Sequence, residues 1–162
     1  MDTAATIDIV RRLYSTVWEW NSGAIDRMAL QLGLSSYQRT DARATFIFPG
    51  GPTCSFYFSE DQILFVESTL EILYNPEELS VAEFQTKERE YLTNYKNLVD
   101  LATQEFGRPL FEGAYGSSGF PEGQNAVRLA LWKTPSAVFM IEYKHDDREL
   151  PMYLCVDVYP QE

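Results

Sequence analysis

The chain has few of the residues on which metal sites and histidine-based catalysis depend. Its 162 residues include one histidine and two cysteines. Zinc sites usually take four ligands from Cys, His and acidic side chains, and widely separated single residues do not make that pattern. Cys54 and Cys155 lie in apolar, strand-like stretches, so we expect buried free thiols. The sequence therefore predicts no metal, no cofactor and no catalytic residue, and it places His145 in a solvated turn.

Positive charge and long apolar runs are also scarce. Against 13 Lys and Arg stand 24 Asp and Glu, which gives a formal charge of −11. Such a chain is repelled by phosphate, so neither nucleic acid nor an anionic membrane is an expected partner. The longest uninterrupted apolar stretch is Ala137–Ile141, and Met1-Asp2-Thr3 lacks the basic start of a secretory signal. We therefore expect a cytoplasmic protein.

Apolar and aromatic residues, by contrast, are plentiful. They make up 45% and 14% of the chain, with ten Tyr, ten Phe and three Trp. This is ample material for one sizeable core, and no linker divides the chain. We predict a single α+β domain over residues 1–162.

Apolar side chains at three- and four-residue spacing predict three helices. The first covers Ile7–Trp20, and a short second helix begins after Ser22, its N-cap. The third and longest covers Val81–Phe106, because Ser80 and Glu83 form a capping box at its start. At 1.5 Å per residue, the third helix is roughly 39 Å long, enough to cross a whole sheet.

Runs rich in β-branched and aromatic residues predict seven strands in two groups. Two segments between the predicted elements are expected to be loops: Ser35–Ala42, which is polar, and Gly107–Asn125, which contains five Gly and two Pro. Because the strands come in runs and the helices are segregated, the expected fold is an antiparallel β-sheet of two meanders with helices packed on one face, in the order ααββββαβββ. The predicted strands are Ala44–Phe48, Thr53–Phe58, Gln62–Val66, Thr69–Tyr74, Ala126–Lys133, Ala137–Lys144 and Met152–Tyr159.

Acidic residues are concentrated in one part of the chain. Taken singly, they mostly occupy turns, exposed helix positions or alternate strand positions, where solvated surface is expected. Between Glu60 and Glu90, however, nine acidic residues face only Lys87 and Arg89, so this segment carries −7 of the total −11. A one-sided negative field of this kind steers a basic partner. The nine are Glu60, Asp61, Glu67, Glu71, Glu77, Glu78, Glu83, Glu88 and Glu90.

The predicted loop Gly107–Asn125 carries three aromatic residues, Phe111, Tyr115 and Phe120. Its glycines lack the Lys-Ser/Thr ending of a phosphate-binding loop. Long loops are often functional, and exposed aromatics are common anchors at protein interfaces. The three side chains are therefore either partner contacts or aromatics folded back onto the sheet.

The second half of the chain has a recognisable layout. A long helix closes at Phe106-Gly107-Arg108-Pro109, and a loop, a strand with Leu129-Ala130-Leu131-Trp132 and two further strands follow. Over about residues 80–159 this layout resembles bacterial toxin-immunity proteins, which are small, often acidic α+β proteins of the cytoplasm. The resemblance implies a protein that binds one cognate toxin tightly and blocks its active site. It assigns no binding residues, because that family places its contacts differently in each member.

We therefore expect a non-enzymatic cytoplasmic binding protein, an immunity protein that occludes the active site of a basic-surfaced antibacterial toxin. One alternative is a secretion chaperone for an effector, which would dimerise and hold its client partly unfolded. Another is a small carboxylate-dependent hydrolase, which requires two or more acids converging in a pocket with raised pKa values. The residues expected to bind the partner are Glu60, Asp61, Glu67, Glu71, Glu77, Glu78, Phe111, Tyr115 and Phe120.

Overall fold

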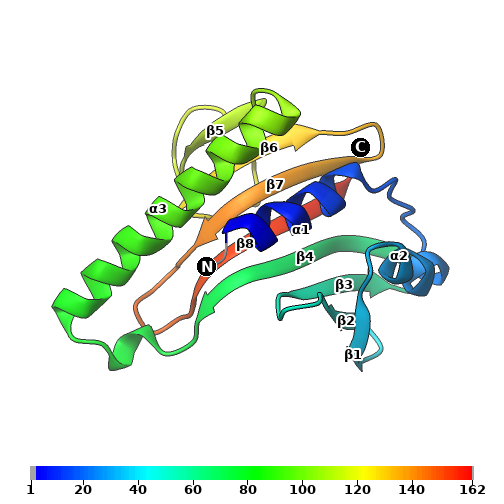
Figure 1. Cartoon of the computed structure of the whole chain (residues 1–162), viewed down its shortest axis with the longest axis horizontal. Coiled ribbons are helices and arrows are strands. Elements are labelled where there is room, and N and C mark those ends of the chain that lie inside the picture. The colour runs from blue at the N-terminus through cyan, green and yellow to red at the C-terminus, as the bar shows by residue number, and fades with distance from the viewer. Residues whose placement is uncertain (1–2, 162) are drawn as a thin grey trace.

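One antiparallel β-sheet runs through the molecule. The computed structural model describes residues 3–161, and within them eight strands follow the order β1-β2-β3-β4-β8-β7-β6-β5. Two four-stranded meanders thus meet at β4 and β8 (Figure 1), which confirms the predicted α+β class. The strands are β1 Ser35–Arg39, β2 Arg43–Ile47, β3 Thr53–Ser59, β4 Gln62–Leu73, β5 Phe111–Ala114, β6 Arg128–Lys133, β7 Ala137–Lys144 and β8 Met152–Pro160.

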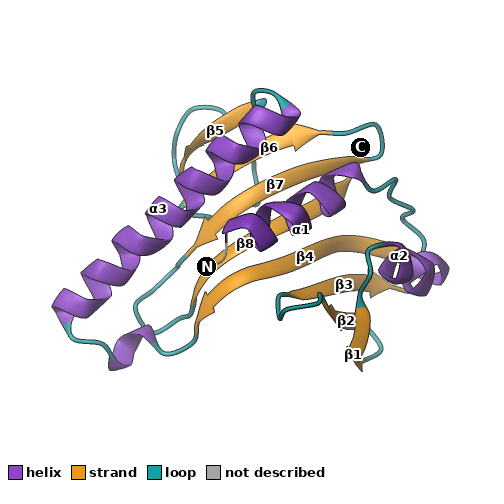
Figure 2. Cartoon of the chain, viewed as in Figure 1, coloured by secondary structure: helices purple, strands orange, loops and turns teal. Residues whose placement is uncertain are grey.

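The two longer helices cover one face of this sheet (Figure 2). They bury the alternate strand residues that point toward them, such as Phe56, Phe139 and Leu154, against side chains such as Leu13 and Tyr95. Within residues 3–161, none of the helices has the length and apolar character that a membrane crossing requires. The helices are α1 Thr3–Ser15, the 3₁₀ turn η1 Ser22–Ala24, α2 Ile25–Gln31, the 3₁₀ turn η2 Pro76–Glu78 and α3 Val81–Phe106.

The first helix is shorter than predicted. It ends at Ser15 instead of Trp20, and the chain then runs without helical structure through residues 16–20. Two contacts with the β6–β7 turn explain the early end: the Trp18 backbone N–H donates to Ser136 Oγ at 3.0 Å, and Trp20 Nε1 donates to the Ser136 carbonyl at 2.8 Å. The helical spacing of apolar residues in the sequence extends to Trp20 because both tryptophans pack on the core, but the backbone that carries them is not helical.

Two predicted loops contain strands. Ser35–Ala42 includes β1, whose five residues are all exposed and pair with β2 through the backbone. Gly107–Asn125 includes β5, which pairs with β6 at the other edge. Conversely, two strands that were predicted separately, Gln62–Val66 and Thr69–Tyr74, form the single strand β4. Its pairing with β8 shifts register between Thr69 and Glu71. Edge pairing and bulges leave no apolar alternation for sequence reasoning to detect.

The start of α3 agrees with its predicted cap. The Glu83 backbone N–H donates to Ser80 Oγ at 3.3 Å, and the Ser80 N–H donates to the Glu83 carboxylate at 2.9 Å. The hydrogen bonds from Ser80 lower the pKa of Glu83.

We expect Ser80→Ala to lower the free energy of unfolding by about 1 kcal/mol, because it removes the side-chain acceptor of the cap. Urea denaturation measures this change. Ser118→Ala, in the exposed 115–120 turn, is the control and should stay within about 0.5 kcal/mol of the wild type.

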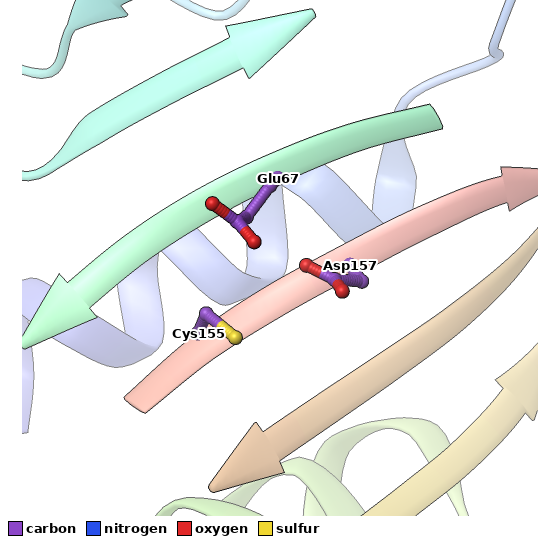
Figure 3. Close-up of side chains that lie close together, drawn as sticks. All are labelled: Glu67, Cys155 and Asp157. Carbon is purple, nitrogen blue, oxygen red and sulfur yellow. The ribbon is translucent and has the colours of Figure 1, made fainter. Parts of the chain in front are cut away.

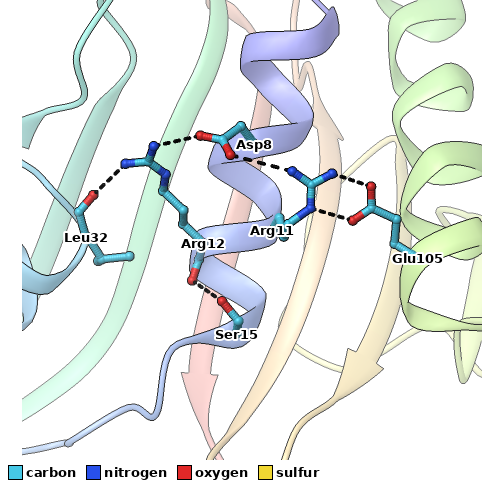
Figure 4. A network of polar contacts seen from close by, with 6 residues as sticks. All are labelled: Asp8, Arg11, Arg12, Ser15, Leu32 and Glu105. Atoms are coloured by element: carbon cyan, nitrogen blue, oxygen red, sulfur yellow. Dashed lines mark hydrogen bonds and ion pairs between the residues drawn. The ribbon is translucent and has the colours of Figure 1, made fainter.

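An ion pair links α1 to α3, a hydrogen bond links it to the end of α2, and Asp8 of α1 itself pairs with both arginines (Figure 4). Arg11 donates to both carboxylate oxygens of Glu105 on α3, at 2.8 and 2.5 Å. On the other side, Arg12 Nη2 lies 2.9 Å from Asp8, and its Nη1 donates to the Leu32 carbonyl at 3.5 Å. These pairs are exposed, so they fix the orientation of α1 more than they stabilise the fold.

Candidate functional site

The acidic residues predicted to bind a partner lie at separate places. Glu60 and Asp61 form the β3–β4 turn, whereas Glu77 and Glu78 lie in η2 beyond the other end of β4. Twelve residues of β4 separate the two pairs, which corresponds to roughly 40 Å at 3.3 Å per residue. A single contact surface of ordinary size therefore does not include both pairs.

Glu67 and Glu71 lie between these ends and face opposite sides of the sheet. Glu67 pairs with Asp157, whose side chain points away from the helices. After the bulge at residue 70, Glu71 pairs with Leu154 and accepts a hydrogen bond from Asn94 of α3 at 2.9 Å. The extra residue of a bulge reverses the alternation of side chains along a strand. Glu71 is therefore part of the helix-covered face.

Of the three loop aromatics, two fold back onto the sheet. Phe111 and Phe120 meet edge to face at 5.9 Å and pack against Ala126 and Met140, on the face opposite the helices. The Tyr115 ring lies 5.5 Å from that of Phe120, between centroids, but the residue is 70% exposed. Only Tyr115 thus presents a free aromatic surface.

One end of the molecule gathers acidic side chains from two connections, and we call it the acidic end. It consists of residues 74–83, which are the β4–α3 connection and the start of α3, and residues 145–151, between β7 and β8; the two segments lie side by side in Figure 1. The two connections meet because the ends of β4 and β8 pair at Leu73 and Met152. A single arginine, Arg148, opposes the acidic side chains here. The six exposed acidic residues are Glu77, Glu78, Glu83, Asp146, Asp147 and Glu149.

The acidic end also exposes large apolar side chains. Tyr74 is 68% exposed, Val81 is 60% exposed and Leu150 is 48% exposed. Exposed apolar side chains rimmed by charges of one sign are typical of a protein-binding surface.

Arg148 ties the two connections together. Its Nη2 donates to the Leu79 carbonyl at 2.7 Å, and its guanidinium lies 5.4 Å from the centre of the Phe84 ring. The acidic end is therefore a connected surface and not two independent loops.

We expect Arg148→Ala to lower the free energy of unfolding by about 1 kcal/mol and to speed hydrogen exchange in residues 145–151, since both contacts are lost. Urea denaturation and exchange mass spectrometry measure the two effects. Arg108→Ala, at another exposed arginine, is the control. Equal exchange rates in the two variants would show that Arg148 does not hold the loop.

A second unusual group lies on the sheet face opposite the helices, and we call it the carboxylate–lysine cluster. It comprises Glu67 of β4, Glu142 and Lys144 of β7, and Asp157 of β8. Lys144 Nζ lies 2.5 Å from Asp157, 3.2 Å from Glu142 and 3.7 Å from Glu67. Three carboxylates therefore surround one ammonium group.

This cluster is largely removed from water. The Glu142 side chain is 0% exposed and that of Asp157 is 1% exposed, whereas Glu67 and Lys144 keep 26% and 18%. Glu67 and Lys144 line a depression of about 380 Å³, together with Tyr57, Tyr153 and both ends of the β7–β8 loop. Two members of the cluster, Glu67 and Lys144, thus meet solvent at this depression.

Burial dominates the electrostatics of the cluster. Desolvation, followed by repulsion from Asp157, raises the pKa of Glu142 to about 7 and also raises the pKa of Glu67. Desolvation raises the pKa of Asp157 against the opposing effect of Lys144. For Lys144, burial opposes the charged form, but its acidic neighbours outweigh burial and raise the pKa. The Lys144 ammonium therefore stays protonated, and its single positive charge does not neutralise all three carboxylates.

Sequence reasoning missed this cluster. Acidic residues at alternate strand positions were in general expected to be solvated, but Glu142 and Asp157, which occupy such positions, are both buried. One signal in the sequence could have indicated their burial. Glu142 and Asp157 each lie within a strand that is otherwise almost continuously apolar, and continuous apolar strands are typical of the centre of a sheet. Pairing between β4 and β8 then brings Glu67 opposite Asp157.

The single histidine is also less solvated than predicted. The turn after it is exposed, but His145 is half-buried, and its ring lies 5.3 Å from that of Phe84. Its Nε2 is buried without a hydrogen-bond partner among the described residues. His145 therefore links β7 to the first turn of α3 by packing.

Comparison of the chain with protein-family models, with curated proteins and with solved structures found no significant match.

Proposed function

We propose that this chain is a non-enzymatic binding protein of the cytoplasm, an immunity protein that neutralises a cognate antibacterial toxin by occluding its active site. The observation that carries the proposal is the acidic end, where six acidic side chains surround exposed Tyr74, Val81 and Leu150. The charges favour approach of a basic surface, and the apolar side chains supply contact area once it has docked.

The shape of the acidic end suits occlusion. Its two connections extend beyond the ends of β4, β7 and β8 and are held to each other by Arg148. A preorganised projection loses less conformational freedom on binding than a mobile loop does. We therefore assign the acidic end, and not the β3–β4 turn, to the active-site cleft of the toxin.

Matched charge reversals test this assignment. One variant carries Lys at four positions of the acidic end: Glu77, Glu78, Asp147 and Glu149. The control variant carries four reversals elsewhere, at the exposed residues Asp41, Glu60, Asp61 and Glu122. The binding probe is a secreted antibacterial toxin that the wild-type protein neutralises, and calorimetry at low and high salt measures its affinity.

We expect the acidic-end variant to bind at least tenfold more weakly at low salt, with a smaller salt dependence than the wild type. The control should keep wild-type affinity apart from a modest effect of total charge. An equal loss in both variants would mean that net charge alone attracts the partner, and the assignment would fail.

Carboxylate-dependent hydrolysis is a second candidate, because three acids with raised pKa values converge at Glu67, Glu142 and Asp157. A raised pKa suits a general acid, and an ionised partner suits a base. Against this role, Lys144 Nζ lies among the carboxylates, and two of the three are inaccessible. Hydrolysis of glycoside or ester substrates by the wild type, lost in Glu67→Gln, would support it over the binding role.

A further inference from the structure

The carboxylate–lysine cluster has a fifth member with different chemistry, the thiol of Cys155. Cys155 lies on β8 two residues before Asp157, so the two side chains point to the same face of the sheet. One donor atom each from Glu67, Cys155 and Asp157 lie within 4.8 Å of one another. Figure 3 shows these three side chains close together, Glu67 from β4 and the other two from β8.

The buried carboxylates have unused acceptor capacity. Glu142 Oε1 and Asp157 Oδ1 are buried and accept no hydrogen bond from the described residues, and Glu142 Oε2 has only the Lys144 ammonium at 3.2 Å. Buried carboxylate oxygens are ordinarily paired, because leaving them unpaired is costly. Lys144 supplies one positive charge to three carboxylates, so the fully ionised cluster has a net charge of −2.

We propose that Glu67, Cys155 and Asp157 form a binding site for a divalent cation of the zinc class, which replaces the Lys144 ammonium between the carboxylates. Zinc accepts sulfur and carboxylate oxygen together at about 2.0–2.3 Å, whereas magnesium and calcium select oxygen ligands alone. The three donors need to approach by roughly 1 Å to reach the separations of a four-coordinate ion, and Glu142 or water supplies the fourth ligand.

The charges and protons of this step balance. The ion brings two positive charges, the Cys155 thiol loses its proton to solvent as the metal–sulfur bond forms, and Lys144 stays protonated as it swings into the depression. The depression of about 380 Å³ gives the ion a route to the site, since Glu67 and Lys144 both line it.

The sequence did not indicate this site because Glu67 is far along the chain from Cys155 and Asp157. Glu67 and Asp157 become neighbours only through the pairing of β4 with β8. The three ligands lie outside the acidic end, although the depression leading to them borders residues 145–151. The metal titration uses the protein alone, so its result does not depend on the proposed protein partner.

Titration of the wild-type protein with Co²⁺, followed by Zn²⁺, tests the proposal. We expect Co²⁺ to produce the charge-transfer absorption of a cobalt–thiolate bond, with release of about one proton, and we expect Zn²⁺ to abolish the absorption by displacement. This measurement needs no variant. A titration to millimolar Co²⁺ at pH 8 without a thiolate band overturns the proposal.

The second cysteine provides a matched control. Cys54 is also buried and free, but it lies on β3 among the residues of the helix-covered face. Cys155→Ser should abolish the thiolate band, Cys54→Ser should leave it unchanged, and Asp157→Asn should weaken Zn²⁺ binding at least tenfold. A band that survives in Cys155→Ser, or one lost in Cys54→Ser, assigns the ion to another thiol and overturns the site.

Discussion

Lys144→Met will lower the free energy of unfolding by about 3–5 kcal/mol at pH 8, the cost of removing one partner from a buried ion cluster. Lys144 Nζ is the only cationic group within 4 Å of Asp157, Glu142 and Glu67 among the described residues. Methionine preserves the apolar stem of the side chain and removes the charge, so the loss measures the electrostatic part of the interaction. Urea denaturation followed by circular dichroism gives the value.

The loss in Lys144→Met should shrink at acidic pH. As the pH falls through the raised pKa values of Glu67, Glu142 and Asp157, these carboxylates take up protons and no longer repel one another. Lys133→Met, at an exposed position of the neighbouring strand β6, is the control. If both variants lost less than about 1 kcal/mol at pH 8, Lys144 would not be neutralising the cluster.

Glu142→Gln will have the opposite effect and will stabilise the protein at pH 8 by up to about 3 kcal/mol, because one pKa unit corresponds to about 1.4 kcal/mol. A shift of the folded-state pKa from 4.5 to about 7 means that the folded protein binds a proton more tightly than the unfolded chain does. The contribution of Glu142 to the free energy of unfolding is fully present at a pH below the pKa of the unfolded state. It falls as the pH rises through the pKa of the folded state and stays constant above it. Glutamine is neutral at every pH, so the variant lacks this decline.

The comparison of pH profiles makes this prediction specific. Wild type and Glu142→Gln should have similar stability near pH 4 and should diverge between about pH 5 and 8. Glu149→Gln, in the exposed β7–β8 loop, should follow the wild-type profile. A Glu142→Gln variant less stable than the wild type at pH 8 would show that attraction to Lys144 outweighs the burial of the glutamate.

Local signals in the sequence predicted local structure well. The capping box at Ser80 and Glu83 and the glycine at Gly107 predicted α3 with the bounds that the structure has, because both signals act within one or two turns of the helix. The Pro49–Pro52 turn likewise separates β2 from β3 as expected. Such features depend on neighbouring residues alone.

Features set by long-range pairing could not be predicted. β1 is a strand only because β2 offers it a backbone edge, and its exposed polar side chains leave no alternation. The carboxylate–lysine cluster needs the β4–β8–β7 order, which no local pattern encodes. The acidic end, in contrast, was predicted in part. Glu77 and Glu78 were expected to bind a partner, whereas Asp146, Asp147 and Glu149 are brought next to them only by the fold.

Hydrogen-exchange mass spectrometry of the complex with a toxin that the protein neutralises tests most directly whether the acidic end is the docking surface. We predict slower exchange in residues 74–83 and 145–151, with residues 59–62 and 115–120 unchanged. Protection confined to the β3–β4 turn or to the Tyr115 segment, with the acidic end exchanging as in the free protein, would contradict this account.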